Sequence, residues 1–135
     1  MQTSAEQKRI ILTLNEPSFP LTAYGDQDRL KQVMVNLIDN ALKYTHSGGN
    51  VVVSATGENG IVKISVKDTG IGIDEGHLSR IFERFYRVDK VRSRESGGTG
   101  LGLAIVKHII EAHDSKIEVH SEIGEGSEFS FRLKA

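Results

Sequence analysis

Residues 26–45, DQDRLKQVMVNLIDNALKYT, carry the strongest structural pattern in the chain. Apolar residues recur in this segment every three or four positions, which is the spacing of one face of an α-helix. These residues are Leu30, Val33, Met34, Leu37, Ile38, Ala41 and Leu42. Asp26 has a side chain suited to an N-cap, so the pattern predicts an amphipathic helix over residues 26–45.

The segments around this helix predict an α+β domain. Runs rich in β-branched and aromatic residues predict strands, and the short link 57–60 predicts a hairpin. The expected strands are 9–14, a short one at 21–24, 51–56, 61–66, 117–119 and 129–133. A second, short helix is marked by Leu78, Ile81, Phe82 and Phe85, a third is expected at about 101–113, and the polar stretch 87–98 is expected to be a mobile loop. This order is typical of a sheet with helices on one face.

Composition narrows the classes of protein. The chain has 135 residues, so one domain is the default. It has no cysteine, which excludes disulfides, thiolate metal sites and a cysteine nucleophile. A net charge of -1 argues against a general nucleic-acid coat. Its 14 glycines exceed the usual share of about 7%, without any low-complexity tract to hold them.

The predicted first helix carries a polar stripe. Asn36, Asn40 and Lys43 lie at i, i+4 and i+7, so they share one side of the helix at the border of its apolar face. An amide oxygen suits Mg²⁺, and a lysine one turn on supplies a positive charge for phosphate. Tyr44 lies between this stripe and the core, where its ring could stack on a flat ligand. The alternative is a row of ordinary solvated side chains.

Two glycine-rich segments and one basic segment are further candidates. In the stretch 68–72, DTGIG, a carboxylate ends a predicted strand and two glycines allow close approach of the backbone, although a tight turn explains the same pattern. In 97–103, GGTGLGL, glycines enter a predicted helix, whose N-terminus favours an anion. Residues 80–94 hold six basic and two acidic side chains, which suits a triphosphate clamp, a solvated loop or an RNA-binding patch.

Together these segments resemble the catalytic ATP-binding domain of sensor histidine kinases, in the GHKL superfamily. Residues 36–45 resemble the family's N box, 68–73 its G1 box, 81–87 its F box and 98–103 its G2 box, in the family's order and spacing. The resemblance covers about residues 26–134. It implies a Bergerat fold, an α/β sandwich with a mixed, mostly antiparallel sheet and about three helices packed on one face. The stretch after Phe85 looks most like phosphate-sensing (PhoR-like) and related cell-wall-sensing kinases.

The resemblance also implies roles for individual residues. Asp68 would accept a hydrogen bond from the adenine amino group, and Asn40, assisted by Asn36, would hold Mg²⁺. Lys43 would contact phosphate and Tyr44 would lie near adenine. The residues that would contribute to catalysis are Asn36, Lys43, Arg84 and Arg87. The remaining nucleotide-binding positions would be Gly70, Gly72, Ile73, Arg87, Gly98, Thr99, Gly100, Leu101 and Gly102, with residues 84–100 as the ATP lid.

Asn36 bears on the kind of reaction. In the gyrase and Hsp90 branches of the superfamily the matching residue is typically a glutamate that activates water, whereas an amide cannot act as a general base. We therefore interpret this chain as one that holds the γ-phosphoryl group for an imidazole acceptor.

No histidine is followed by Glu or Asp and then Pro, as in the family's phosphoacceptor motif. We therefore expect residues 1–135 to be a single catalytic domain without dimerisation, phosphoacceptor or sensor domains. Its partners would be its own phosphoacceptor domain and, through the full-length kinase, a response regulator, with no nucleic acid. We expect the isolated domain to be a monomer. The full-length kinase would be a homodimer anchored in the bacterial membrane, with this domain in the cytoplasm. The alternatives are a serine kinase or stand-alone ATPase of the same superfamily, a degenerate nucleotide-binding module that only docks partners, and an RNA-binding domain.

Overall fold

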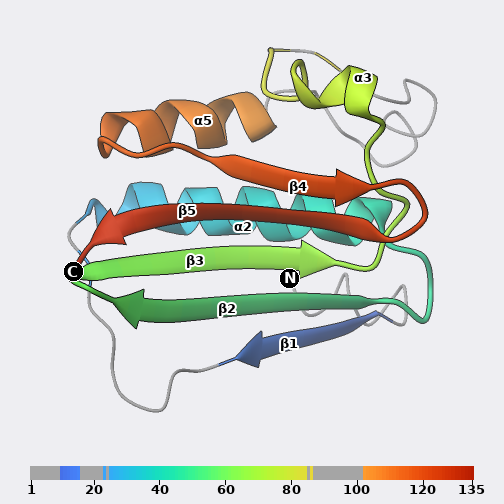
Figure 1. Ribbon diagram of the computed structural model, residues 1–135, viewed down its shortest axis with the longest axis horizontal. Coiled ribbons are helices and arrows are strands. Elements are labelled where there is room, and N and C mark those ends of the chain that lie inside the picture. The colour runs from blue at the N-terminus through green and yellow to red at the C-terminus, as the bar shows by residue number, and fades with distance from the viewer. Residues whose placement is uncertain (1–9, 16–22, 24, 85, 87–101) are drawn as a thin grey trace.

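The computed structural model describes residues 10–15, 23, 25–84, 86 and 102–135. Within these residues the chain forms five strands and three helices (Figure 1). In chain order they are β1 (Ile11–Asn15), α2 (Gln27–Tyr44), β2 (Asn50–Glu58), β3 (Ile61–Asp68), α3 (Glu75–Leu78), α5 (Gly102–Ala112), β4 (Glu118–Glu122) and β5 (Gly126–Lys134).

The strands form one sheet in the order β1-β2-β3-β5-β4. β1 pairs with β2 in parallel, and every other pair is antiparallel. The mixed, mostly antiparallel sheet expected from the resemblance is therefore confirmed. β3 is the central strand, so its last residue, Asp68, lies opposite Val51 of β2 on one side and Ser127 of β5 on the other.

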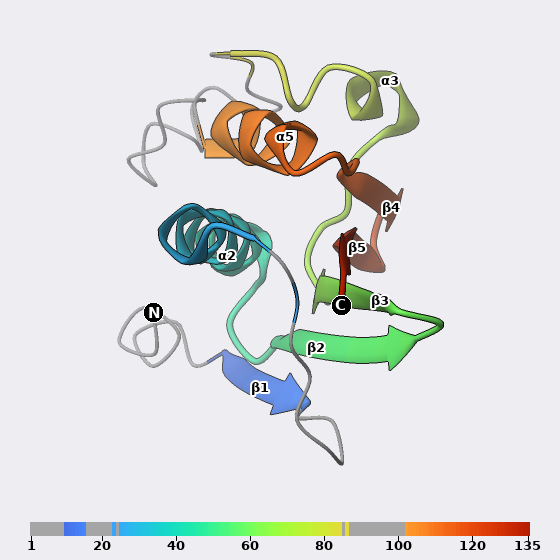
Figure 2. The same cartoon turned by 90° about the vertical axis from the view of Figure 1, so that its left-hand side faces the viewer.

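Helices α2 and α5 lie on the same face of the sheet, and α3 lies near its β4 edge (Figure 2). The core forms between this face and the two long helices. Its largest fully buried side chains include Phe129 and Phe131 of β5 and Leu37 of α2. His113 follows the last residue of α5, and its ring links α5 to the start of α2. Its Nε2 accepts from the Asp26 backbone N–H (2.9 Å), and its Nδ1 lies 2.8 Å from the Ile109 carbonyl oxygen. His113 thus links the N-terminus of α2 to the C-terminal end of α5.

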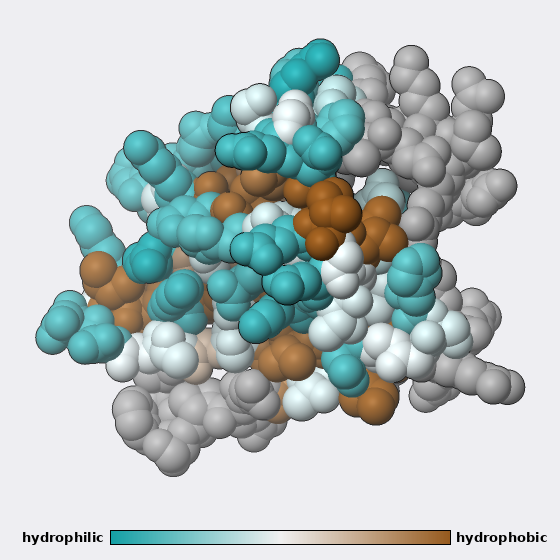
Figure 3. All heavy atoms as spheres, turned by 45° about the vertical axis from the view of Figure 1, so that its right-hand side comes forward, coloured by the Kyte–Doolittle hydropathy of each residue, from teal (hydrophilic) through white to brown (hydrophobic). Residues whose placement is uncertain are grey.

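The opposite face of the sheet is polar. Strand alternation places Ser54, Ser65 and Ser130 side by side there, and the hydroxyls of Ser54 and Ser65 are 2.7 Å apart. Arg132 of β5 forms an ion pair of 2.6 Å with Glu118 of β4. Seen obliquely in Figure 3, hydrophilic side chains cover most of this face.

Most predicted elements are confirmed. Asp26 is the N-cap of α2, with its side chain accepting from the Arg29 N–H, and α2 ends one residue before the predicted limit. The hairpin of β2 and β3 forms, and α5 matches the predicted third helix. The sequence underestimated β4 and β5, which are longer than the apolar runs that indicated them. Residues 21, 22 and 24 of the predicted short strand and the whole predicted loop 87–98 lie outside the described residues.

The predicted second helix is wrong in position. A single helical turn, α3, precedes it, because the Asp74 side chain accepts from the Gly76 N–H and starts the helix early. The chain then continues in turns, with backbone bonds from Arg80 to His77 and from Glu83 to Arg80 in place of a helical ladder. Leu78, Ile81 and Phe82 still pack against the core, which explains their helix-like spacing.

Among the described residues no helix has both the length and the apolar character needed to cross a membrane.

We predict that Phe129→Ala lowers the free energy of unfolding by about 3–5 kcal/mol, because a large side chain is lost from the closed core. Phe129 is 2% exposed and packs edge-on against Phe82. Ile11, which is 62% exposed, gives the control: Ile11→Ala should cost no more than about 0.5 kcal/mol. Urea unfolding followed by circular dichroism measures both, and equal losses would contradict the assigned core.

Candidate functional site

The C-terminal half of α2 contacts the first residue of α5 near the middle of the helix and the loop after β3 at its end. Two hydrogen bonds fix this arrangement. Asn36 Nδ2 of α2 donates to the carbonyl of Gly102, the first residue of α5 (3.3 Å), and the Ile71 N–H after β3 donates to the Tyr44 carbonyl (3.1 Å). Asn36 and Tyr44 are about 12 Å apart along the helix. The polar stripe of α2 therefore connects the start of α5 to the loop that follows Asp68.

Asp68 is a buried carboxylate, 4% exposed. Its Oδ1 accepts two backbone N–H groups, from Gly70 (2.8 Å) and from Ser127 (3.3 Å). No described residue donates to Oδ2, and among the described residues no fully buried side-chain oxygen lacks a partner. Oδ2 is therefore not completely enclosed, and it remains able to accept a hydrogen bond from a ligand.

Burial raises the pKa of Asp68 above the ordinary value of 3.8, while the hydrogen bonds from Gly70 and Ser127 act in the opposite direction. Desolvation is the larger effect, because a charged carboxylate loses the solvation that water would provide. The protein thus holds a carboxylate at a place where its charged form reduces stability. Such groups are more frequent in functional sites than in structural ones.

The loop 69–73 is held closely against the rest of the domain. A Cβ atom on Gly70 would lie 2.3 Å from the Tyr44 carbonyl oxygen. Gly72 has a φ of +77°, and a Cβ there would lie 2.1 Å from the Glu122 carbonyl oxygen. Both positions thus require glycine for contacts within the protein. The sequence interpretation, in which these glycines give a ligand close access to the backbone, stays a prediction.

The side chains of the α2 stripe differ in what they already bind. Asn36 donates to Gly102, which leaves its Oδ1 as an acceptor, and the half-buried amide of Asn40 bonds to no described residue. Lys43 pairs with Asp39, with 3.5 Å between Nζ and Oδ2. Tyr44 is half-buried beside the loop that it anchors. The structure thus places Asn36 against Gly102 of α5, and it places Tyr44, two turns further along α2, against loop 69–73.

Two serines that the sequence analysis missed support Asp68 from β4 and β5. Ser127 supplies one of the backbone N–H groups, and its hydroxyl lies 2.8 Å from that of Ser121. The Ser121 hydroxyl accepts from the Ile73 N–H at 2.7 Å and donates to the Gly126 carbonyl at 3.1 Å. The only signal in the sequence was the turn at Gly124 and Gly126, which does not reveal the register that pairs Ser127 with Asp68.

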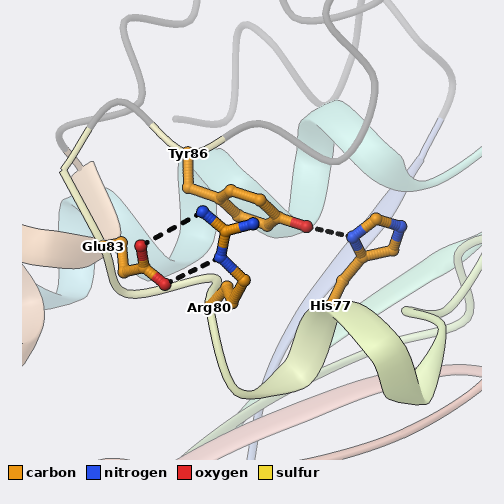
Figure 4. A network of polar contacts seen from close by, with 4 residues as sticks. All are labelled: His77, Arg80, Glu83 and Tyr86. Carbon is orange, nitrogen blue, oxygen red and sulfur yellow. Dashed lines mark hydrogen bonds and ion pairs between the residues drawn. The ribbon is translucent and has the colours of Figure 1, made fainter.

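Glu83 and Tyr86 of the predicted F box form a compact polar network with His77 and Arg80, which precede it in the chain (Figure 4). The Arg80 guanidinium bonds to Glu83 at 2.9 Å and lies 4.6 Å from the centre of the Tyr86 ring. The Tyr86 hydroxyl bonds to Nδ1 of His77. The bond from Arg80 lowers the pKa of Glu83. Arg84 lies beside this network with an exposed side chain that bonds to no described residue.

Several predicted site residues cannot be placed. Arg87, Gly98, Thr99, Gly100 and Leu101 lie outside the described residues. Gly102 begins α5, where the N-terminal backbone of an 11-residue helix favours an anion. In the described part of the chain, no three His, Asp or Glu residues come together as a metal site. A cation here would depend on amide oxygens and on ligand oxygens.

Comparison with known proteins agrees with this geometry. Residues 25–135 match the family described as histidine kinase-, DNA gyrase B- and HSP90-like ATPase. The chain belongs to this ATPase family. The recognised histidine-kinase type of catalytic domain is thereby confirmed, whereas the finer likeness to phosphate-sensing kinases stays a prediction.

Individual relatives of this ATPase domain are sensor kinases. The chain is 44% identical to the sensor histidine kinase WalK of Bacillus subtilis over 95% of its own length and 21% of WalK. It is 41% identical to the sensor-like histidine kinase SenX3 of Mycolicibacterium smegmatis, over 98% of the chain and 34% of SenX3. The chain thus spans only a fifth to a third of these relatives.

Two solved structures share the fold closely. The catalytic domain of histidine kinase ThkA superposes with a TM-score of 0.84 at 28% identity, over 98% of this chain and 84% of ThkA's. Full-length ShkA in complex with AMPPNP gives 0.84 at 35% identity, over 98% of this chain and 28% of ShkA's. The α+β fold inferred from the sequence is confirmed.

We predict that Asp68→Asn stabilises the domain increasingly as pH rises. Because the folded pKa is raised, the charge of Asp68 costs stability above its unfolded pKa, and this cost grows until pH exceeds the folded pKa. An asparagine oxygen can still accept from Gly70 and Ser127 without the charge. Urea unfolding of both proteins between about pH 3 and 7 measures the difference, and a difference that stays constant or shrinks with rising pH would contradict the argument.

We predict that Gly70→Ala lowers the free energy of unfolding by about 1–3 kcal/mol, because the new methyl group collides with the Tyr44 carbonyl. Gly102 is the matched control, since a Cβ there meets no atom within 4 Å. Gly102→Ala should unfold at the same denaturant concentration as the parent or higher. Similar losses in both variants would show that the loop does not need the close approach.

Proposed function

We propose that this domain binds Mg-ATP and donates the γ-phosphoryl group to a histidine on a separate dimerisation and phosphoacceptor domain of a two-component system. The observation that carries the proposal is Asp68: a buried carboxylate with one oxygen held by two backbone amides and the other without a donor among the described residues. The α2 stripe leads from it to the start of α5, so one end of the site suits a base and the other suits phosphates.

The adenine end would be specified by Asp68. Its Oδ2 can accept from an exocyclic amino group but would repel a carbonyl oxygen at the same position, which distinguishes adenine from hypoxanthine or guanine. Burial strengthens this discrimination, because an unpaired charged group away from water is costly. Tyr44 would border the base, and Gly70, Gly72 and Ile73 would form its other edge.

The phosphate end would be built from α2 and α5. Asn40 and the open oxygen of Asn36 are neutral ligands of the kind that Mg²⁺ takes when phosphates and waters complete its shell. The metal, when bound, would offset negative charge on the transferring phosphoryl group. Lys43 would add a positive charge, and the N-terminal amides of α5 would face the anion. Gly98, Thr99, Gly100, Leu101 and Arg87 are proposed to complete this end.

The acceptor would be an imidazole instead of water. Asn36 commits its amide N–H to Gly102 and carries no carboxylate that could remove a proton from water. The exposed guanidinium of Arg84 is proposed to meet the phosphoryl group or the incoming domain.

The partners follow from the relatives. WalK and SenX3 are far longer sensor kinases. We therefore propose a full-length homodimeric, membrane-anchored kinase with its own phosphoacceptor domain and a response regulator, in which the present domain is cytoplasmic and monomeric when isolated.

We predict that Asp68→Asn weakens ATP binding about 10- to 150-fold, because the adenine amino group loses a charged acceptor and meets an amide. Asn40→Ala should instead remove the gain in affinity that Mg²⁺ provides and leave metal-free binding nearly unchanged. Calorimetric titration with ATP, with and without Mg²⁺, separates the two effects. Ser54→Ala, on the polar face of the sheet, is the control that should bind like the parent.

The same proteins test phosphoryl transfer. With labelled Mg-ATP and a separately supplied histidine-bearing domain, acid-labile label should appear on that domain, faster than inorganic phosphate is released, and not on the chain itself. Label on a serine-bearing acceptor instead would favour the serine-kinase alternative. Tight ATP binding by Asp68→Asn would contradict the proposed adenine site.

A further inference from the structure

Ser121 connects the two segments that hold Asp68. It lies half-buried on the edge strand β4, opposite Ser127 of β5. Its hydroxyl accepts from the Ile73 N–H of the loop and donates to the Gly126 carbonyl of β5. Asp68 Oδ1 joins the same two segments, because it accepts from Gly70 of the loop and from Ser127 of β5.

The bond from Ser121 is made by a side chain of another strand, whereas Ile71 is attached through backbone groups alone. Both backbone groups of Ile71 are hydrogen-bonded: its N–H donates to the Tyr44 carbonyl, and its carbonyl accepts from the Gly124 N–H. Among the described residues, Ser121 is the residue outside 68–73 whose side chain bonds to loop 69–73, while the loop's own Thr69 hydroxyl accepts from the Asn50 N–H at 2.9 Å. The Ser121 contact can therefore be removed by a substitution on β4 that leaves the sequence of the loop and its backbone bonds unchanged.

The hydroxyl geometry of Ser121 is also well satisfied. One hydroxyl has a single proton and two lone pairs. If the proton goes to the Gly126 carbonyl, the lone pairs can receive the Ile73 N–H and the Ser127 hydroxyl, all at 2.7–3.1 Å. Such a three-bonded hydroxyl fixes the spacing between loop and strand, and so the spacing between the two donors to Asp68 Oδ1.

We propose that Ser121 is a positioning residue for adenine recognition: it aims Oδ2 of Asp68 by locking loop 69–73 to β5, and touches no nucleotide atom itself. This inference rests on the proposed function and adds a residue that sets its specificity. Without the bond, the Gly70 and Ser127 amides can drift apart, and the direction of Oδ2 becomes less defined. A ligand that bonds to Oδ2 would then bind less tightly, whereas the affinity for a ligand that does not bond to Oδ2 would be unchanged.

The test compares ATP with inosine triphosphate, which has an oxygen in place of the 6-amino group. In the parent chain ATP should bind more tightly than inosine triphosphate. In Ser121→Ala the dissociation constant for ATP should rise about 5-fold, the worth of one neutral hydrogen bond, while that for inosine triphosphate stays the same. The ratio of the two constants should fall accordingly. Ser121→Thr, which keeps the hydroxyl on a strand residue, should restore the ratio.

Ser54→Ala is the matched control, because it removes another half-buried strand hydroxyl and its hydrogen bond to Ser65, on the opposite face of the sheet. It should leave the ratio unchanged even if it lowers the melting temperature. A Ser121→Ala protein that loses affinity equally for both nucleotides, or for neither, overturns the positioning role alone. A parent chain that binds neither nucleotide, or prefers inosine triphosphate, overturns the proposed function and the role with it.

Discussion

The rest of the structure depends on one buried carboxylate. Asp68 is taken out of water at the end of the central strand, and two backbone N–H groups from segments that are distant in the sequence compensate its Oδ1. This compensation requires β5 to lie beside β3, a loop with glycine where it meets Tyr44 and Glu122, and a β4–β5 turn that reaches back to that loop. Helices α2 and α5 cover the same face of the sheet, where their apolar sides form the core.

The candidate site combines a rigid end around Asp68 with a polar stripe of side chains along α2. At the Asp68 end nearly every contact involves at least one backbone group, in a hydrogen bond or in a close approach of glycine, which allows little adjustment. Along α2 the contacts are made by side chains, namely the amide of Asn36 and the ion pair of Lys43. Such a division suits a ligand with one flat, invariant part and one flexible, charged part, since specificity needs fixed groups whereas phosphates and a metal tolerate movement.

Local patterns predicted the helices and the hairpin well, because the 3.6-residue period and the Asp26 cap depend on neighbouring residues. The same reasoning misplaced the second helix, because Leu78, Ile81 and Phe82 keep a helical spacing while the backbone turns every three residues. The candidate site residues Asn36 and Asp68 were selected from their types and positions, and their roles stay predictions. Ser121 and Ser127 were not, because their roles arise from a register between β3, β5 and β4 that no local pattern encodes.

The sheet order has a consequence for how the domain folds. β5, which lies between β3 and β4, is the last described strand in the sequence, and its pairing with β3 joins residues about half the chain apart. Such non-local pairing is slow, because the chain loses the entropy of closing a long loop before the paired strands contribute stabilising contacts. During synthesis, β1, α2 and the hairpin of β2 and β3 emerge first, and Asp68 then lacks its bond from the Ser127 N–H. The burial of Asp68 is therefore completed late in folding. The pairing of β5 with β3 completes both the sheet and the candidate binding site.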